Sequence, residues 1–217
     1  MRVVFFGDGE NIFSNRHFHA LLETDARIEA VVDAPKANWR STNTADSGEV
    51  ESFVVWAERC GVPVRKDENP NTPDTVQALA ALDPELFIAV GYTKRIKDGL
   101  LSVPRLGAVN FHASLLPAYR GKHPLYWALE NKEPLVGLSV HFMDPGLDTG
   151  NIVYQVEVAV RENDTVASLY ARIMDLSTGL VVRLLEDAKE GRLHGTPQED
   201  FPWEPSYYSS LPEEKSG

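Results

Sequence analysis

Short apolar runs alternate with helical patterns along the first two thirds of the chain. Four runs rich in Val, Ile and Phe end on a Gly, an Asp or a polar residue, as buried parallel strands do: they read RVVFFG, RIEAVVD, ELFIAVG and GAVNFH. The segments between them, SNRHFHALLE, VESFVVWAERCG, TPDTVQALAALD and residues 93–101, have helical spacing, and Ser14 and Thr72 are placed as caps. This alternation predicts an α/β fold with a doubly wound, mostly parallel sheet and helices on both faces.

The pattern changes after Gly121. HPLYWALENKE reads as a helix, and LVGLSVHFM and NIVYQVEVAV read as two strands joined by the loop DPGLDTG. From 164 to 190 the apolar residues recur every three or four positions and Gly191 follows, which predicts a long amphipathic helix. We therefore expect one main domain over residues 1–193. The loop 34–48 and a C-terminal tail over 194–217, both rich in Pro, Ser, Asp and Glu, are expected at the surface.

Charge and composition narrow the class of protein. The chain has 217 residues, a formal net charge of −11, and a single cysteine, so it forms no internal disulfide. A large nucleic-acid surface needs clustered Lys and Arg, so we expect no tRNA or DNA partner. No apolar run approaches the ~18 residues of a membrane helix, and MRVVFFGDG lacks a cleavage site. We expect a cytoplasmic protein with no membrane partner, and the sequence leaves a homodimer open.

The end of the fourth predicted strand carries the candidate chemistry. Asn110 and His112 lie two residues apart and therefore on one strand face. Asp148, after the next long strand, could return beside them and would favour the imidazolium form of His112. An amide donor and an imidazolium aimed at one point would stabilise an oxyanion. Taken singly, each residue is more often structural than catalytic.

A glycine-rich turn near the N-terminus offers a competing interpretation. GDGENI after the first strand, with Asp33 at the end of the next, resembles a dinucleotide-binding fingerprint. Ile12 stands where the third glycine belongs, and Asp8 and Glu10 place negative charge where a pyrophosphate would lie. A tight turn that needs its glycines for backbone freedom explains the stretch better than a nicotinamide cofactor.

Other catalytic devices are weakly supported. There is no G-x-S-x-G motif, and Ser114 follows His112 too closely to assign a catalytic triad. His17 and His19 lie in a helical pattern, where residues two apart do not share a face, so we expect no metal site. A nucleophile would then come from the substrate.

Two segments together carry a resemblance to a known family. NFHASLLPAYRG followed by GLSVHFMDPGLDTGNIVYQ resembles the N10-formyltetrahydrofolate-dependent formyltransferases, which include methionyl-tRNA formyltransferase, glycinamide ribonucleotide transformylase and sugar N-formyltransferases. The resemblance spans about residues 1–193 and implies a Rossmann-like formyltransferase fold. It implies a catalytic domain in which Asn110, His112 and Asp148 are the catalytic residues and a formyl group passes to an amine.

The resemblance also implies a donor site and no metal. N10-formyltetrahydrofolate would be the formyl donor, bound after the third long strand and before the catalytic Asp. The implied pocket residues are Gly91, Tyr92, Arg95, Ile96, Met143, Asp144 and Leu147. Tyr92 and Ile96 could equally be core residues.

The acceptor is a small amine by this reasoning. Methionyl-tRNA formyltransferases carry a further C-terminal domain, and glycinamide ribonucleotide transformylases bind phosphate at a loop where this chain has Glu10. YRGKHPLYWAL resembles the R-G-x-x-P-x-x-W run of the sugar N-formyltransferases, which implies a nucleotide-linked amino sugar. The candidate residues for binding it are Gly9, Glu10, Ser114, Arg120 and Lys122.

Three alternatives remain open at this stage. The chain could be a purine enzyme similar to glycinamide ribonucleotide transformylase, or a formyltetrahydrofolate deformylase that uses water as the nucleophile. A folate- or nucleotide-binding module without turnover is disfavoured, because all three implied catalytic residues are present.

Overall fold

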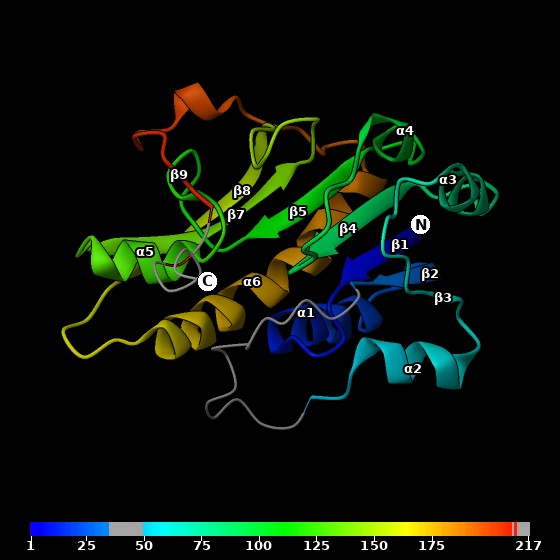
Figure 1. Ribbon diagram of the computed structural model, residues 1–217, viewed down its shortest axis with the longest axis horizontal. Helices are drawn as coiled ribbons and strands as arrows, with labels where there is room; N and C mark the ends of the chain where they lie inside the picture. The colour runs from blue at the N-terminus through cyan, green and yellow to red at the C-terminus, as the bar shows by residue number, and fades with distance from the viewer. Residues whose placement is uncertain (35–49, 210, 212–217) are drawn as a thin grey trace.

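A seven-stranded sheet runs through the centre of the molecule (Figure 1). The computed structural model describes residues 1–34, 50–209 and 211. The strands of this sheet are β1 (Arg2–Gly7), β2 (Arg27–Asp33), β3 (Val64–Arg65), β4 (Leu86–Val90), β5 (Ala108–His112), β7 (Leu135–Phe142) and β8 (Ile152–Ala159). Their spatial order is β3-β2-β1-β4-β5-β7-β8. Strands β1 to β5 are parallel to one another, whereas β7 is antiparallel to both β5 and β8. The predicted α/β fold with a mostly parallel sheet is confirmed.

Six helices and a small second sheet complete the described part of the chain. The helices are α1 (Ile12–Leu22), α2 (Phe53–Cys60), α3 (Pro73–Ala80), α4 (Asp98–Leu101), α5 (Pro124–Glu130) and α6 (Val166–Lys189), followed by the 3-10 turn η1 (Gln198–Asp200). The second sheet pairs β6 (Arg120–Gly121) with β9 (Tyr207–Tyr208). None of the described helices combines the length and the apolar character needed to cross a membrane.

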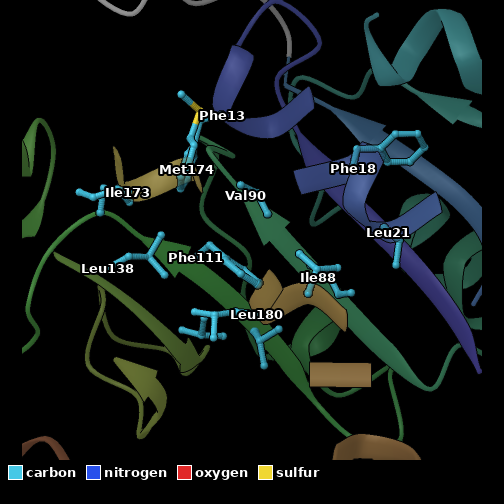
Figure 2. Packing of buried hydrophobic residues seen from close by; sticks show 14 of the residues in the cluster. Phe13, Phe18, Leu21, Ile88, Val90, Phe111, Leu138, Ile173, Met174 and Leu180 are labelled. Atoms are coloured by element: carbon cyan, nitrogen blue, oxygen red, sulfur yellow. The ribbon is translucent and has the colours of Figure 1, made fainter. Parts of the chain in front are cut away.

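The core lies on both faces of the central sheet, because the side chains of each strand alternate between the two faces. All five residues of β4 are buried, as expected for a parallel strand covered on both sides. One face packs against α1, α2, α5 and α6, and Phe18, Phe111 and Leu180 all belong to this layer (Figure 2). The other face packs against α3 and α4 through Leu79 and Leu100.

The helix starts agree with the sequence in part. Thr72 caps α3 as predicted, since its side chain accepts a hydrogen bond from the backbone N–H of Thr75. Helix α1, however, begins three residues earlier than a Ser14 cap would place it, with Asn11 as its cap. Ser14 is instead buried inside α1, and its hydroxyl donates to the carbonyl of Val90 at 2.7 Å. A tertiary contact with the end of β4 therefore replaces the predicted capping role.

The segment after residue 193 corrects one expectation. Thr196 forms an antiparallel bridge with Ile152 on β8, and β9 pairs with β6. Gln198 is only 4% exposed, so this part of the predicted surface tail packs into the protein, although Glu199 and Asp200 are exposed. Of the predicted surface loop 34–48, all but Ala34 lies outside the described residues.

Candidate active site

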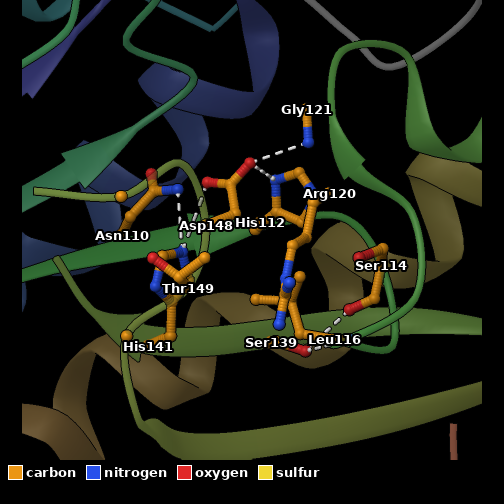
Figure 3. A network of polar contacts seen from close by, with 12 residues as sticks. Asn110, His112, Ser114, Leu116, Arg120, Gly121, Ser139, His141, Asp148 and Thr149 are labelled. Carbon is orange, nitrogen blue, oxygen red and sulfur yellow. Dashed lines mark hydrogen bonds and ion pairs between the residues drawn. The ribbon is translucent and has the colours of Figure 1, made fainter. Parts of the chain in front are cut away.

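Asn110 and His112 both come from β5 and lie on the same side of the sheet (Figure 3). Their neighbour is the antiparallel strand β7, on which His141 stands opposite Asn110 and Ser139 opposite His112. Asn110 is half-buried, while His112 is 7% exposed. The strand end thus presents an amide and an imidazole at one place, as the sequence predicted.

Asp148 reaches the same place from the turn between β7 and β8. Its Oδ2 lies 3.7 Å from Nδ1 of His112 and accepts a hydrogen bond from the backbone N–H of Gly121 at 2.9 Å. The contact with His112 is therefore an ion-pair distance and longer than a hydrogen bond. The predicted approach of Asp148 to His112 is present in the fold, although no sequence pattern specifies it.

Both ring nitrogens of His112 face an oxygen acceptor. Its Nε2 lies 2.9 Å from the carbonyl oxygen of Tyr119, which only accepts hydrogen bonds, so Nε2 carries a proton. Its Nδ1 faces the carboxylate of Asp148 at 3.7 Å. Because both ring nitrogens are engaged, proton donation to a substrate requires the Nε2–H of His112 to leave the Tyr119 carbonyl.

Asp148 is an ionised carboxylate. Burial alone would raise its pKa, but the charge of His112, the contacts with His141 and the N–H of Gly121 outweigh it and hold the pKa of Asp148 well below its usual range. Its side chain is only 10% exposed, so this charge acts where water screens little. A negative charge is therefore maintained beside the imidazole at neutral pH.

His141 is a site residue that sequence reasoning missed. It is 2% exposed, and its Nε2 lies 3.6 Å from Oδ1 of Asp148 and 3.2 Å from Nδ2 of Asn110. Its Nδ1 lies 2.7 Å from the carbonyl oxygen of Phe142 and so carries a proton. The available signal was a histidine inside a predicted strand, but the strand register that places it opposite Asn110 is a tertiary feature.

A buried hydroxyl network braces the chain after β5. Ser139 donates to the carbonyl of Ser114 at 2.7 Å and accepts from the backbone N–H of Leu116 at 3.0 Å. Ser114 is 3% exposed and its own hydroxyl donates to the carbonyl of Ala118 at 2.8 Å. Ser114, a predicted substrate-binding residue, thus uses its proton to hold the loop, and it offers no exposed hydroxyl to an acceptor.

The predicted donor pocket is made of two loops that contact each other. Gly91, Tyr92, Arg95 and Ile96 follow β4, while Met143, Asp144 and Leu147 follow β7. The guanidinium of Arg95 donates to the carbonyl of Pro145, which joins the two loops. Ile96 is 2% exposed and belongs to the core, whereas Leu147 is 48% exposed.

Two residues after β4 show how this pocket is shaped. Gly91 has a φ of +64°, and a Cβ placed there would lie 2.8 Å from Oγ of Ser14, so the position requires glycine. The ring of Tyr92 packs edge-on against Phe6, and burial raises the pKa of its hydroxyl. That buried hydroxyl has no hydrogen-bond partner among the described residues, which fits a pocket for a polar heterocycle.

The predicted acceptor residues fall into two groups. In the loop after β1, the N–H of Gly9 donates to Asp33 at 2.8 Å and the N–H of Glu10 donates to Asp8 at 2.9 Å. Carboxylate oxygens thus already accept hydrogen bonds from the backbone N–H groups that a phosphate would need. On the loop after β5, the guanidinium of Arg120 donates to Gln198, whereas the Lys122 side chain is exposed.

The described residues contain no cluster of three or more His, Cys, Asp or Glu side chains suited to a metal ion.

Two cavities flank the loop that follows β5. One, of about 380 Å³, is lined by Tyr119, Trp203 and Tyr208 among others. The other, of about 540 Å³, is lined by Arg120, Gln198 and residues of the C-terminal segment.

Comparison with known proteins gives consistent matches. Residues 1–185 match the family model described as formyl transferase. A methionyl-tRNA formyltransferase of Thermodesulfovibrio yellowstonii is 32% identical over 197 residues, covering 90% of this chain and 62% of that protein. The chain therefore spans less than two thirds of that relative's length. The relative is a tRNA enzyme, so the comparison argues against our expectation that tRNA is excluded.

Solved structures share the fold at lower identity. A phosphoribosylglycinamide formyltransferase from Bacillus halodurans matches with a TM-score of 0.71 and 22% identity, covering 89% of this chain and all of that one. An N-formyltransferase from Helicobacter canadensis, solved with folinic acid and dTDP-3-aminofucose, matches with a TM-score of 0.68 and 19% identity, covering 95% of this chain and 70% of that one.

Proposed function

This chain belongs to the formyl transferase family, and we propose on that basis that it transfers a formyl group from N10-formyltetrahydrofolate to a primary amine. The observation that carries the proposal is the ionised carboxylate of Asp148 between His112 and His141, beside the half-buried amide of Asn110. This arrangement concentrates a proton donor, a proton acceptor and a neutral amide at one strand end.

The donor would bind between the loop after β4 and the loop after β7. The unpartnered hydroxyl of Tyr92 and the close approach that Gly91 allows both fit a flat polar ring system there. When bound, the folate supplies an activated formyl carbonyl. The role of the loops is to orient that carbonyl toward the end of β5.

The residues of β5 and the β7–β8 turn would promote attack by an amine. The amide of Asn110 and the imidazolium of His112 would stabilise the negative charge that develops on the formyl oxygen. Asp148, 3.7 Å from Nδ1 of His112, would hold that ring in place and help move the proton that the attacking amine loses through water. The nucleophile belongs to the acceptor, so these residues need form no covalent bond.

For the acceptor we propose a nucleotide-linked amino sugar. Arg120 and Lys122 lie on the same loop as Gly121, which contacts Asp148, so a diphosphate bound by them would lie near the reacting group. In the loop after β1, carboxylates already accept hydrogen bonds from the backbone N–H groups of Gly9 and Glu10. This disfavours binding of the glycinamide ribonucleotide phosphate to that loop.

A second candidate acceptor is methionyl-tRNA. It is favoured by the 32% identity to a methionyl-tRNA formyltransferase over 90% of this chain. The net charge of −11 speaks against it, because tRNA binding needs clustered cations.

One assay separates these possibilities. The protein is incubated with N10-formyltetrahydrofolate and with dTDP-linked amino sugars, glycinamide ribonucleotide or methionyl-tRNA, and both formyl-amine and free formate are measured. Formylation of an amino sugar supports the full proposal, and formylation of another amine replaces the acceptor only. Formate release alone identifies a hydrolase, and neither product with any acceptor overturns formyl transfer.

A further inference from the structure

Gln198 is a buried polar residue that the proposed mechanism does not use. It begins the short turn η1 in the C-terminal segment, and its neighbours Glu199 and Asp200 are exposed while it is 4% exposed. A buried side-chain amide is costly unless its donors and acceptor are satisfied. The contacts of Gln198 therefore account for its burial.

All the hydrogen bonds of this amide lead to the candidate active site. Its Nε2 donates to the carbonyl oxygens of Asp148 and Gly150, each at 2.9 Å. Its Oε1 accepts from Nη2 of Arg120 at 2.6 Å and from Nε at 3.2 Å. A single side chain thus ties the turn that carries Asp148 to the loop that carries Arg120.

The Asp148 turn needs such a tie. Asp148 has a φ of +53°, a left-handed conformation that non-glycine residues adopt only when the surroundings hold it. Two carbonyls in this turn, those of Asp148 and Gly150, bond to Gln198, and the Asp148 carboxylate bonds to the N–H of Gly121. Gln198 therefore supports the Asp148 carboxylate in two ways. It bonds directly to the backbone of the turn that carries Asp148, and it bonds to Arg120, the neighbour of the Gly121 whose N–H donates to that carboxylate.

We propose that Gln198 is a positioning residue that holds the Asp148 carboxylate between His112 and His141. The inference rests on the proposed function for its consequence in turnover, whereas the position of the carboxylate can be tested without turnover. When the amide donors are lost, the turn relaxes and the carboxylate moves away from the His112 ring. A displacement of about 1 Å in a catalytic group lowers the rate roughly 100-fold.

The test compares three variants of the full chain. Gln198→Glu keeps an oxygen for Arg120 but removes both donors to the turn, and Gln198→Met removes every polar contact at similar size. Glu199→Gln is the matched control, because it changes an exposed side chain one residue along the same turn. For each, kcat and the donor KM are measured with the acceptor that the wild type uses, together with Tm and the ring NMR signals of His112 and His141.

We expect Gln198→Glu and Gln198→Met to lower kcat roughly 10- to 100-fold with little change in the donor KM. The ring signals of His112 and His141 should move toward those of Asp148→Asn, and Glu199→Gln should match the wild type. Unchanged ring signals in a folded Gln198 variant overturn the proposal, as does a fall in kcat that the control shares. If Gln198→Met does not fold, Gln198→Glu alone decides.

The NMR signals of the two histidine rings also distinguish a failure of the positioning role of Gln198 from a failure of the proposed formyl transfer. If the wild type turns over no acceptor, formyl transfer fails, yet a shift of the His112 signals in the Gln198 variants still supports the positioning role. If turnover is normal in both folded Gln198 variants, the positioning role fails while formyl transfer stands.

Discussion

The backbone N–H of Gly121 donates to Oδ2 of Asp148 at 2.9 Å, and the same glycine packs against the backbone of Tyr208. Gly121 has a φ of +95°, and a Cβ placed on it would lie 2.2 Å from the carbonyl oxygen of Tyr208. The residue therefore connects the candidate catalytic carboxylate with strand β9 of the C-terminal segment. The approach to Tyr208 leaves no room for a side chain at Gly121.

Replacing this glycine should disturb both contacts. We expect Gly121→Ala to lower the free energy of unfolding by about 1–3 kcal/mol or more, because positive φ and a backbone clash act together. Turnover should fall as well, since Asp148 loses its N–H donor. Gly191→Ala is the control, because Gly191 has a φ of +67° but no atom within 4 Å of a new Cβ. Denaturant unfolding should show a clearly smaller loss for the control, and equal losses would contradict the clash.

Removing the carboxylate of Asp148 or the imidazole of His112 should lower the rate of the chemical step. We expect Asp148→Asn and His112→Ala each to lower kcat by about 100-fold or more, as for groups that act in the transition state. Donor binding, measured by calorimetric titration, should survive, because the proposed folate pocket lies on other residues. Asp175→Asn, which removes an exposed partner of Arg16, is the control. Near-normal turnover in either site variant would show that the roles are wrongly assigned.

His17 should make stability depend on pH. Burial lowers its pKa from 6.5 to about 4, while its Nδ1 and Nε2 lie at hydrogen-bond distance from Phe13 and Ser177. Between these two values the unfolded chain binds a proton that the folded protein does not, so stability falls as pH falls from 6.5 to 4. The loss amounts to about 3 kcal/mol at 1.36 kcal/mol per pKa unit.

The measurement is the free energy of unfolding of wild type and His17→Gln across this pH range. Gln does not titrate, so the variant should be less stable at pH 7 but should lose less stability on acidification. His19→Gln is the control, since His19 is only half-buried. Parallel pH profiles for wild type and His17→Gln would contradict the prediction.

Tyr92 and Tyr154 should respond in opposite ways to loss of the hydroxyl. The Tyr92 hydroxyl is buried with no partner among the described residues, so Tyr92→Phe should leave stability unchanged or raise it by about 1 kcal/mol. Tyr154 donates to Asp187 at 2.5 Å, so Tyr154→Phe should lower stability by a similar amount. Thermal unfolding compares the two variants.

Folate titration then tests the donor pocket with the same pair. Tyr92→Phe should weaken donor binding if the hydroxyl contacts the pterin, and Tyr154→Phe should leave it unchanged. Equal affinities for wild type and Tyr92→Phe would remove Tyr92 from the proposed pocket.

Local patterns accounted for much of the fold. Buried runs such as the β4 residues 86–90 specified parallel strands, because a strand covered on both faces needs apolar residues at every position. Thr72 was identified as a cap, because its hydroxyl acts within three residues. The capping role predicted for Ser14 was wrong, because its hydroxyl bonds to the Val90 carbonyl, which lies 76 residues away and beyond the reach of a local pattern.

The candidate site, too, has features that follow from local spacing and features that depend on the tertiary structure. The sequence by itself determined that Asn110 and His112 share a strand face, because a strand repeats every two residues. Only the tertiary structure decided that His141 stands opposite Asn110 and that Gln198 returns from the C-terminal segment to hold the Asp148 turn. Strand register and long-range hydrogen bonds depend on how the whole core packs, and no local spacing along the chain encodes them.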